Sequence, residues 1–126
     1  MILKIAVAYA ALCGALGVIL GAFGAHGLRD SLEPRLMQTF ETAVQYQLIH
    51  ALALLLVALL YGQVGRSLAL EISIFAFMAG ILLFSGSLYG LVLTEARWLG
   101  PVTPLGGLCF IVGWMALLVG GIQKVG

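Results

Sequence analysis

Charged residues are scarce in this chain. Lys, Arg, Asp and Glu together make up 9% of its 126 residues, whereas 63% are hydrophobic. A soluble globular domain carries about a quarter charged residues, so this composition excludes that class and predicts an integral membrane protein. The formal net charge is +1, which offers no basic field for nucleic acid, so we expect no nucleic-acid partner.

Cysteine and the usual signatures of chemistry are also rare or absent. The two cysteines, Cys13 and Cys109, lie inside apolar runs, which is typical of small packing residues and excludes a disulfide framework. The chain has no CxxC, HxxxH or GxSxG motif, no haem motif and no dinucleotide-binding loop. We therefore predict no cofactor, no metal site and no enzymatic activity.

What the chain does contain is four long apolar runs. A helix of about 20 residues crosses the roughly 30 Å of hydrocarbon in a bilayer, and backbone groups in lipid must bond within their own segment, so each run should be a helix. We expect spans at about 4–27, 35–61, 68–93 and 104–124. The first run is longer than the apolar part of an ordinary signal peptide, so we expect it to be retained. The predicted fold is an all-α membrane protein, a compact antiparallel four-helix bundle forming one domain.

Residues that cap or break helices support these boundaries. Gly62 and Gly65 separate the second and third spans. Ser67 is expected to cap the third helix, and Thr103 to cap a fourth helix that has Pro104 as its first residue. Because the connections are short, neighbouring helices should be antiparallel and both termini should share one side.

Glycines recur on one face of the first span and on one face of the fourth. Small residues let helices approach closely in lipid, where apolar burial does not drive association. We therefore predict glycine-rich packing faces within the bundle or between copies, and a homo-oligomer in the lipid bilayer. The residues predicted to pack helices are Gly14, Gly17, Gly21, Gly24, Gly106, Gly113 and Gly120.

The head of the second span is unusually polar, in the stretch ETAVQYQLIHALALLL. At 100° per residue it has two polar stripes separated by an apolar wedge that includes Phe40, Val44 and Leu48. We expect the wedge to face lipid and the stripes to face protein or an interfacial cavity. A helix beginning near Pro34 exceeds the hydrocarbon thickness, so its first three turns should lie near the headgroups.

His26, at the end of the first span, should lie on the same membrane side as this polar head. We predict a polar cluster that joins the first two helices and offers a candidate ligand or ion site, with the ligand unidentified. Its residues are His26, Glu41, Gln45, Tyr46, Gln47 and His50.

The segments GAFGAHGL and ETAVQYQLIHALALL, followed by short spans, resemble the YgdD-like family of small bacterial membrane proteins, domain of unknown function 423. Transmembrane protein 256 of animals is similar. The resemblance implies four helices and a bacterial inner-membrane location, and it implies no activity. The matching positions are Gly21, Gly24, Ala25, His26, Gly27, Phe40, Ala43, Tyr46, Gln47, His50 and Ala51.

Several functions stay open. The favoured one is a structural or accessory bundle that contacts lipid or partner proteins, because basic groups such as Arg29, Arg35 and Arg97 attract anionic lipid. The alternative is a transporter or channel for protons, metal or a small solute that uses His26, Glu41 and His50. Lysines and arginines are balanced between the two sides, and the α-amino group favours cytoplasmic termini.

Overall fold

The computed structural model of the protein describes residues 1–125, which consist of helices joined by turns. Four helical segments are long and apolar enough to cross a membrane, which confirms the predicted all-α membrane fold. They are Ile2–Leu28, Pro34–Val64, Leu68–Thr94 and Arg97–Val125.

Two of the four segments contain π-helical turns. The first segment is α1 (Ile2–Phe23) followed by the π turn η1 (Gly24–Leu28), and the second is α2 (Pro34–Val64). The third is α3 (Leu68–Gly80), the π turn η2 (Ile81–Ser85) and α4 (Gly86–Thr94). The fourth begins with the 3₁₀ turn η3 (Arg97–Leu99) and continues as α5 (Val102–Val125).

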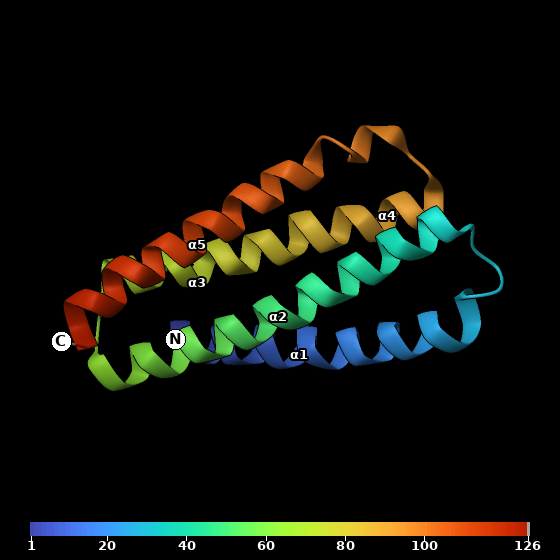
Figure 1. The fold of residues 1–126 in the computed structure, drawn as a ribbon. Coiled ribbons are helices and arrows are strands. Elements are labelled where there is room, and N and C mark those ends of the chain that lie inside the picture. The colour runs from blue at the N-terminus through green and yellow to red at the C-terminus, as the bar shows by residue number, and fades with distance from the viewer. Residues whose placement is uncertain (126) are drawn as a thin grey trace.

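The helices form two antiparallel pairs that meet along α2 (Figure 1). α1 packs against α2, α5 packs against α3, and α2 lies against α3 and α4. The N- and C-terminal ends lie at the same end of the molecule, as the short connections predicted. Within residues 1–125 no contact joins α1 to α5, so these two helices form opposite flanks of an open bundle.

The helix ends agree with the predictions in part. Ser67 caps α3, because its hydroxyl accepts a hydrogen bond from the Leu70 N–H at 3.3 Å. α2 runs past Gly62 and ends only at Gly65, whose φ of 86° favours glycine. The predicted cap at Thr103 is wrong: α5 begins at Val102, and the Thr103 hydroxyl contacts the side chain of Ser87 instead.

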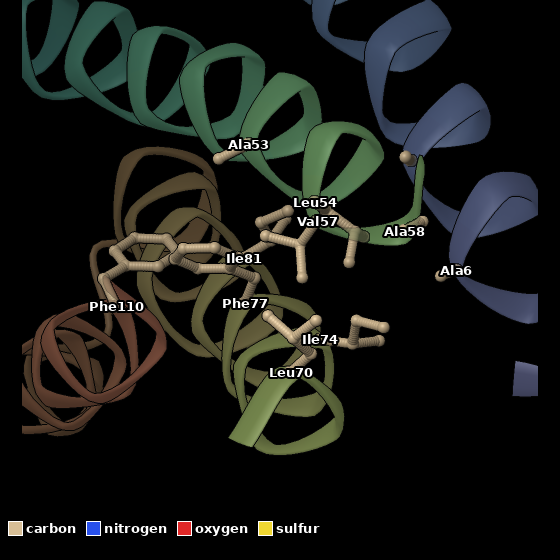
Figure 2. Packing of buried hydrophobic residues seen from close by; sticks show 11 residues of the cluster. Ala6, Ala53, Leu54, Val57, Ala58, Leu70, Ile74, Phe77, Ile81 and Phe110 are labelled. Atoms are coloured by element: carbon tan, nitrogen blue, oxygen red, sulfur yellow. The ribbon is translucent and has the colours of Figure 1, made fainter. Parts of the chain in front are cut away.

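The main core lies where α2, α3 and α5 meet (Figure 2). Leu54 and Val57 of α2 point toward Ile74 and Phe77 of α3, and Phe110 of α5 lies beside Phe77. All but Phe110 are fully buried, and Phe110 is buried too. α1 joins this core mainly through small residues such as Ala6 and Ala10.

The apolar wedge of α2 faces α1, and the expectation that it faces lipid is wrong. Phe40, Val44 and Leu48 lie over glycines of the first segment, where a Cβ atom would fall 3.3 Å or less from a side-chain atom of the wedge. Large side chains fill the groove that a glycine face leaves open, which brings the two helix axes close together. The glycines under the wedge are Gly17, Gly21 and Gly24.

Candidate functional site

His50 lies at the middle of α2, which has 31 residues and its midpoint at Ile49. Its Nδ1 atom lies 2.9 Å from the Tyr46 carbonyl oxygen, and its Nε2 atom lies 3.1 Å from the Trp114 indole nitrogen. Because an indole N–H only donates, Nε2 must accept, and Nδ1 then carries the proton and donates to the carbonyl. The geometry therefore assigns His50 the neutral tautomer with both ring nitrogens in use.

Aromatic rings surround the imidazole. The His50 ring stacks on Phe110 with centroids 3.6 Å apart and planes within 10°. Trp114 meets the His50 ring edge-on at 5.9 Å, and Phe77 lies 5.6 Å away. This packing leaves His50 only 4% exposed, so the ring links α2 to α3 and α5 in a dry environment.

Gln47, one turn before His50, links a different set of helices. Its Nε2 donates to the Cys13 carbonyl of α1 at 2.7 Å, and its Oε1 accepts from the Tyr89 hydroxyl of α4 at 2.7 Å. A Gln side chain has both donors and acceptors, so one buried residue satisfies partners on two helices. Gln47 is 4% exposed and therefore joins three elements away from lipid.

Other buried hydroxyls bond to backbone carbonyls of neighbouring helices. Tyr9 donates to Met78 at 2.7 Å, Ser73 to Gly113 at 2.8 Å and Ser85 to Ala43 at 2.7 Å. Within residues 1–125, every buried side-chain nitrogen and oxygen has a hydrogen-bond partner. An unpaired polar group is costly in hydrocarbon, and this part of the chain contains none that is buried.

The predicted polar cluster does not gather in one place. His26 lies exposed at the end of the first segment, and Glu41 and Gln45 are exposed on α2. Tyr46 is 38% exposed, and its ring lies 4.6 Å from that of Phe84. Gln47 and His50 are buried against different helices, as described above. A ligand-binding role for the six residues stays a prediction.

The predicted packing glycines fall into two groups, those packed against a neighbouring helix and those in open space. Gly106, Gly113 and Gly120 lie against the third segment so closely that an added Cβ would overlap neighbouring atoms, and Gly17 and Gly24 do the same against α2. Gly14 has no atom within 4 Å of its Cβ position, so no helix of this chain packs directly on it.

Sequence reasoning missed the partners of the buried polar groups. Trp114 and Tyr89 each carry a polar atom inside an apolar span, where it needs a hydrogen-bond partner, and this was the signal available in the sequence. A further set of polar contacts lies at the end of the molecule that holds both termini. There the Glu71 carboxylate accepts a hydrogen bond from the Tyr61 hydroxyl at 2.8 Å and lies 3.4 Å from the Arg66 guanidinium. These three residues tie α2 to α3 across the turn at Gly65.

An open furrow runs along the outer face of the α1–α2 pair, which we call the outer furrow. Three hollows of about 370, 450 and 670 Å³ follow one another along this face. The first is lined partly by Glu41 and Gln45, the second by Gly14 and Leu52, and the third by Lys4 among others. The furrow is apolar over most of its length, with polar groups toward its ends.

The chemistry this arrangement can perform follows from those contacts. In the described part of the chain, no group of three or more His, Cys, Asp or Glu side chains is placed to hold a metal ion. Both nitrogens of His50 and both polar atoms of Gln47 already have partners within the bundle. The buried polar groups therefore act as links between helices.

Comparison with known proteins places the chain among bacterial membrane proteins. Residues 20–107 match the family model described as "Protein of unknown function (DUF423)". A UPF0382 membrane protein of Staphylococcus haemolyticus is 40% identical over 124 residues, 98% of this chain and 100% of its own length. The UPF0382 membrane protein YwdK of Bacillus subtilis is 40% identical over 96% of this chain and 98% of its own.

A relative from another bacterial genus shows similar agreement. The UPF0382 membrane protein of Haemophilus influenzae is 40% identical over 114 residues, 90% of each chain. No solved structure matches this chain. The matched relatives carry no enzymatic name, and each is described as a membrane protein. The resemblance predicted from the sequence motifs is thus confirmed, and this four-helix membrane protein belongs to the DUF423 family.

Proposed function

We propose that the protein is a structural or accessory component of the bacterial inner membrane, without enzymatic activity, that associates with further copies of itself along the outer furrow. In this role it provides a rigid membrane scaffold whose copies assemble laterally. The proposal includes cytoplasmic termini, which the α-amino group favours.

The observation that carries this proposal is the position of Gln45. It lies four residues before the α2 midpoint at Ile49, about 6 Å along the axis at 1.5 Å per residue. The hydrocarbon extends about 15 Å to each side of the bilayer centre. Gln45 is exposed, and no hydrogen bond within residues 1–125 uses its amide. A polar amide facing lipid tails at that depth is costly unless another molecule satisfies it.

A second copy of the chain suits this requirement. An amide both donates and accepts, so two Gln45 side chains related by a twofold axis can bond to one another. The same face presents Gly14, which has open space around it within one chain. A glycine so placed lets a helix of another copy approach closely. The outer furrow therefore offers both a polar side chain that can pair with another copy and a glycine that lets the helices of two copies approach closely.

The transport alternative requires ionisable groups that can exchange protons or ions with a path through the bundle. His50, the histidine at mid-membrane depth, has both nitrogens bonded to partners in the same chain and is packed among aromatic rings. These contacts favour a structural role for it. Proton or cation flux into liposomes that disappears in His50→Ala would instead support transport.

The test of self-association is energy transfer between labelled copies in lipid vesicles. We expect the wild type to associate and Gln45→Leu to weaken association by about threefold to twentyfold, the range expected from one interhelical hydrogen bond in a membrane. Gly14→Leu should also weaken association, because its side chain would hold the helix of the other copy away. Gln45→Asn, which keeps the amide, should retain more association than Gln45→Leu.

Gly86→Leu is the matched control for Gly14→Leu. Gly86 lies in α4 on another face and also has no atom within 4 Å of its Cβ position. It should therefore tolerate leucine without any effect on association. A wild type that is monomeric at all lipid dilutions, or equal losses in Gly14→Leu and Gly86→Leu, would refute the proposed interface.

A further inference from the structure

A small polar cavity lies at the end of the molecule opposite the termini. Its volume is about 190 Å³, and its walls come from the start of α2, the end of α4 and the turn η3. The lining residues are Arg35, Leu36, Leu91, Glu95 and Arg97. Unlike the outer furrow, this cavity has two arginines and a glutamate in its lining.

Its depth corresponds to the lipid headgroups. Arg35 lies 14 residues before the α2 midpoint at Ile49, about 21 Å along the axis. The hydrocarbon ends about 15 Å from the bilayer centre, and the headgroup region extends to about 20–22 Å. Trp98, next to Arg97, is 72% exposed, and exposed tryptophans at this level anchor proteins in the membrane interface.

The arginines are available to bind an anion. Arg97 forms no salt bridge within residues 1–125. Arg35 has a single contact, 3.6 Å from the Glu33 carboxylate, and both side chains are largely exposed, so that contact is weak. Arg35 and Leu36 also belong to the first turn of α2, where Glu33 makes no side-chain cap. The positive end of the helix dipole therefore faces the same region.

Glu95 adds a carboxylate to the cavity wall, and this restricts which ligands can bind there. It lies on the cavity wall and is the non-glycine residue with a left-handed backbone in the described chain, at φ 54°. A carboxylate there repels a bare multivalent anion and accepts a hydrogen bond from a donor. Two guanidinium groups with one carboxylate complement a group that has a phosphate at one end and a donor at the other.

We propose that this cavity binds the headgroup of a phospholipid whose phosphodiester carries a hydrogen-bond donor, as the ethanolamine and glycerol headgroups do and the choline headgroup does not. Arg35 and Arg97 bind the phosphate, and Glu95 accepts from the ammonium or hydroxyl group. This site deepens the accessory role proposed above. It rests on the membrane placement of the chain and does not depend on self-association.

The experiment titrates the full-length protein in detergent micelles with lipids of matched chains and measures bound lipid by native mass spectrometry. We expect phosphatidylethanolamine and phosphatidylglycerol to bind more tightly than phosphatidylcholine. The double variant R35Q/R97Q should bind both about thirtyfold more weakly, which corresponds to about 1 kcal/mol for each basic residue near a membrane surface. E95Q should mainly reduce the preference over phosphatidylcholine.

R29Q is the matched control, because Arg29 is an exposed arginine of the same end that does not line the cavity. It should bind lipid as the wild type does, and melting curves without added lipid should show that all variants fold. Equal binding of the three lipids by the wild type, or equal losses in R29Q and R35Q/R97Q, would overturn the proposal. Displacement of lipid by inorganic phosphate would identify a soluble anion as the ligand and also overturn it.

Repeating the titration with Gly14→Leu separates this site from self-association. If copies associate along the outer furrow, this variant associates more weakly than the wild type and should still keep the lipid preference. If a variant loses association but still binds lipid, the headgroup site is supported independently of the interface. If a variant loses lipid binding but still associates, the interface is supported independently of the headgroup site.

Discussion

The two helix pairs use glycine differently. Between the third segment and α5 the fit is reciprocal, because each partner contributes both glycines and the aromatic rings that cover them. The Phe110 ring covers Gly80 and the Phe77 ring covers Gly113, while Gly106 lies against the backbone of Phe84. Between α1 and α2 the close contacts are one-sided: glycines of the first segment accept large side chains of α2, with Phe40 over Gly24 as one example, whereas Gly62 of α2 meets Leu3 only at ordinary contact distance.

This difference explains which surfaces are free. A reciprocal fit uses the facing surfaces of both helices and resists sliding, because rings from each side lie in hollows of the other. A one-sided fit uses only the edge of α1 that faces α2, and the edge at Gly14 stays open. The same small residues thus close one interface and leave a second surface available.

The largest expected effect tests the reciprocal interface. In Gly106→Ala the new Cβ would overlap the backbone nitrogen of Phe84, which can move only if η2 moves. In Gly17→Ala it would meet the end of the Leu48 side chain, which can rotate away. We expect Gly106→Ala to lower the free energy of unfolding by about 3 kcal/mol and Gly17→Ala by less than about 1 kcal/mol, measured by denaturation in detergent.

Gly107→Ala is the control for that pair, because the next residue along α5 has open space at its Cβ position. It should match the wild type or exceed it slightly, since alanine is the better helix former. If Gly106→Ala and Gly107→Ala had the same free energy of unfolding, the close approach of α5 to η2 would be wrong.

A smaller effect is expected at His50. His50→Ala removes the ring that stacks on Phe110 and leaves the Trp114 N–H without its acceptor. We expect a loss of about 2 kcal/mol in the free energy of unfolding. Gln123→Ala, at the exposed end of α5, should change it by less than about 0.5 kcal/mol. Equal melting temperatures for the two variants would contradict a structural role for His50.

The smallest effect concerns the link between α2 and α4. A double-mutant cycle with Gln47→Leu and Tyr89→Phe isolates their 2.7 Å hydrogen bond. Interhelical hydrogen bonds in membranes average about 0.6 kcal/mol, so we expect a coupling energy of that size. Tyr9→Phe, whose hydroxyl bonds to Met78 instead, should show no coupling to Gln47→Leu. A coupling energy of zero for both pairs would contradict the Gln47 link between α2 and α4.

Much of the fold was predictable because membrane constraints are severe. Length and apolarity alone identified four helices, and the hydroxyl of Ser67 identified the start of α3. The cap assigned to Thr103 failed because its hydroxyl has a partner on a neighbouring helix, which local sequence does not reveal. The same reason hid Trp114 and Tyr89 as partners of the polar residues on α2.

The polar head of the second span shows where prediction stopped. Its composition indicated that polar groups entering the membrane should pair within the protein, and Gln47 and His50 do so. It did not indicate that one stripe would face α4 and α5 while Glu41 and Gln45 remained exposed. The ligand role assigned to these residues together with His26 awaits experiment.

The sequence by itself determined the class and the number of spans, because hydrophobic length and helical rise set these quantities. Its motifs indicated the family. Only the tertiary structure decided which face of each helix meets protein and which meets lipid. The physical reason is that lipid tails and a protein interior are equally apolar, so hydrophobic periodicity does not distinguish them. The shape fit of glycines against side chains such as Phe40 and Phe77 makes that choice.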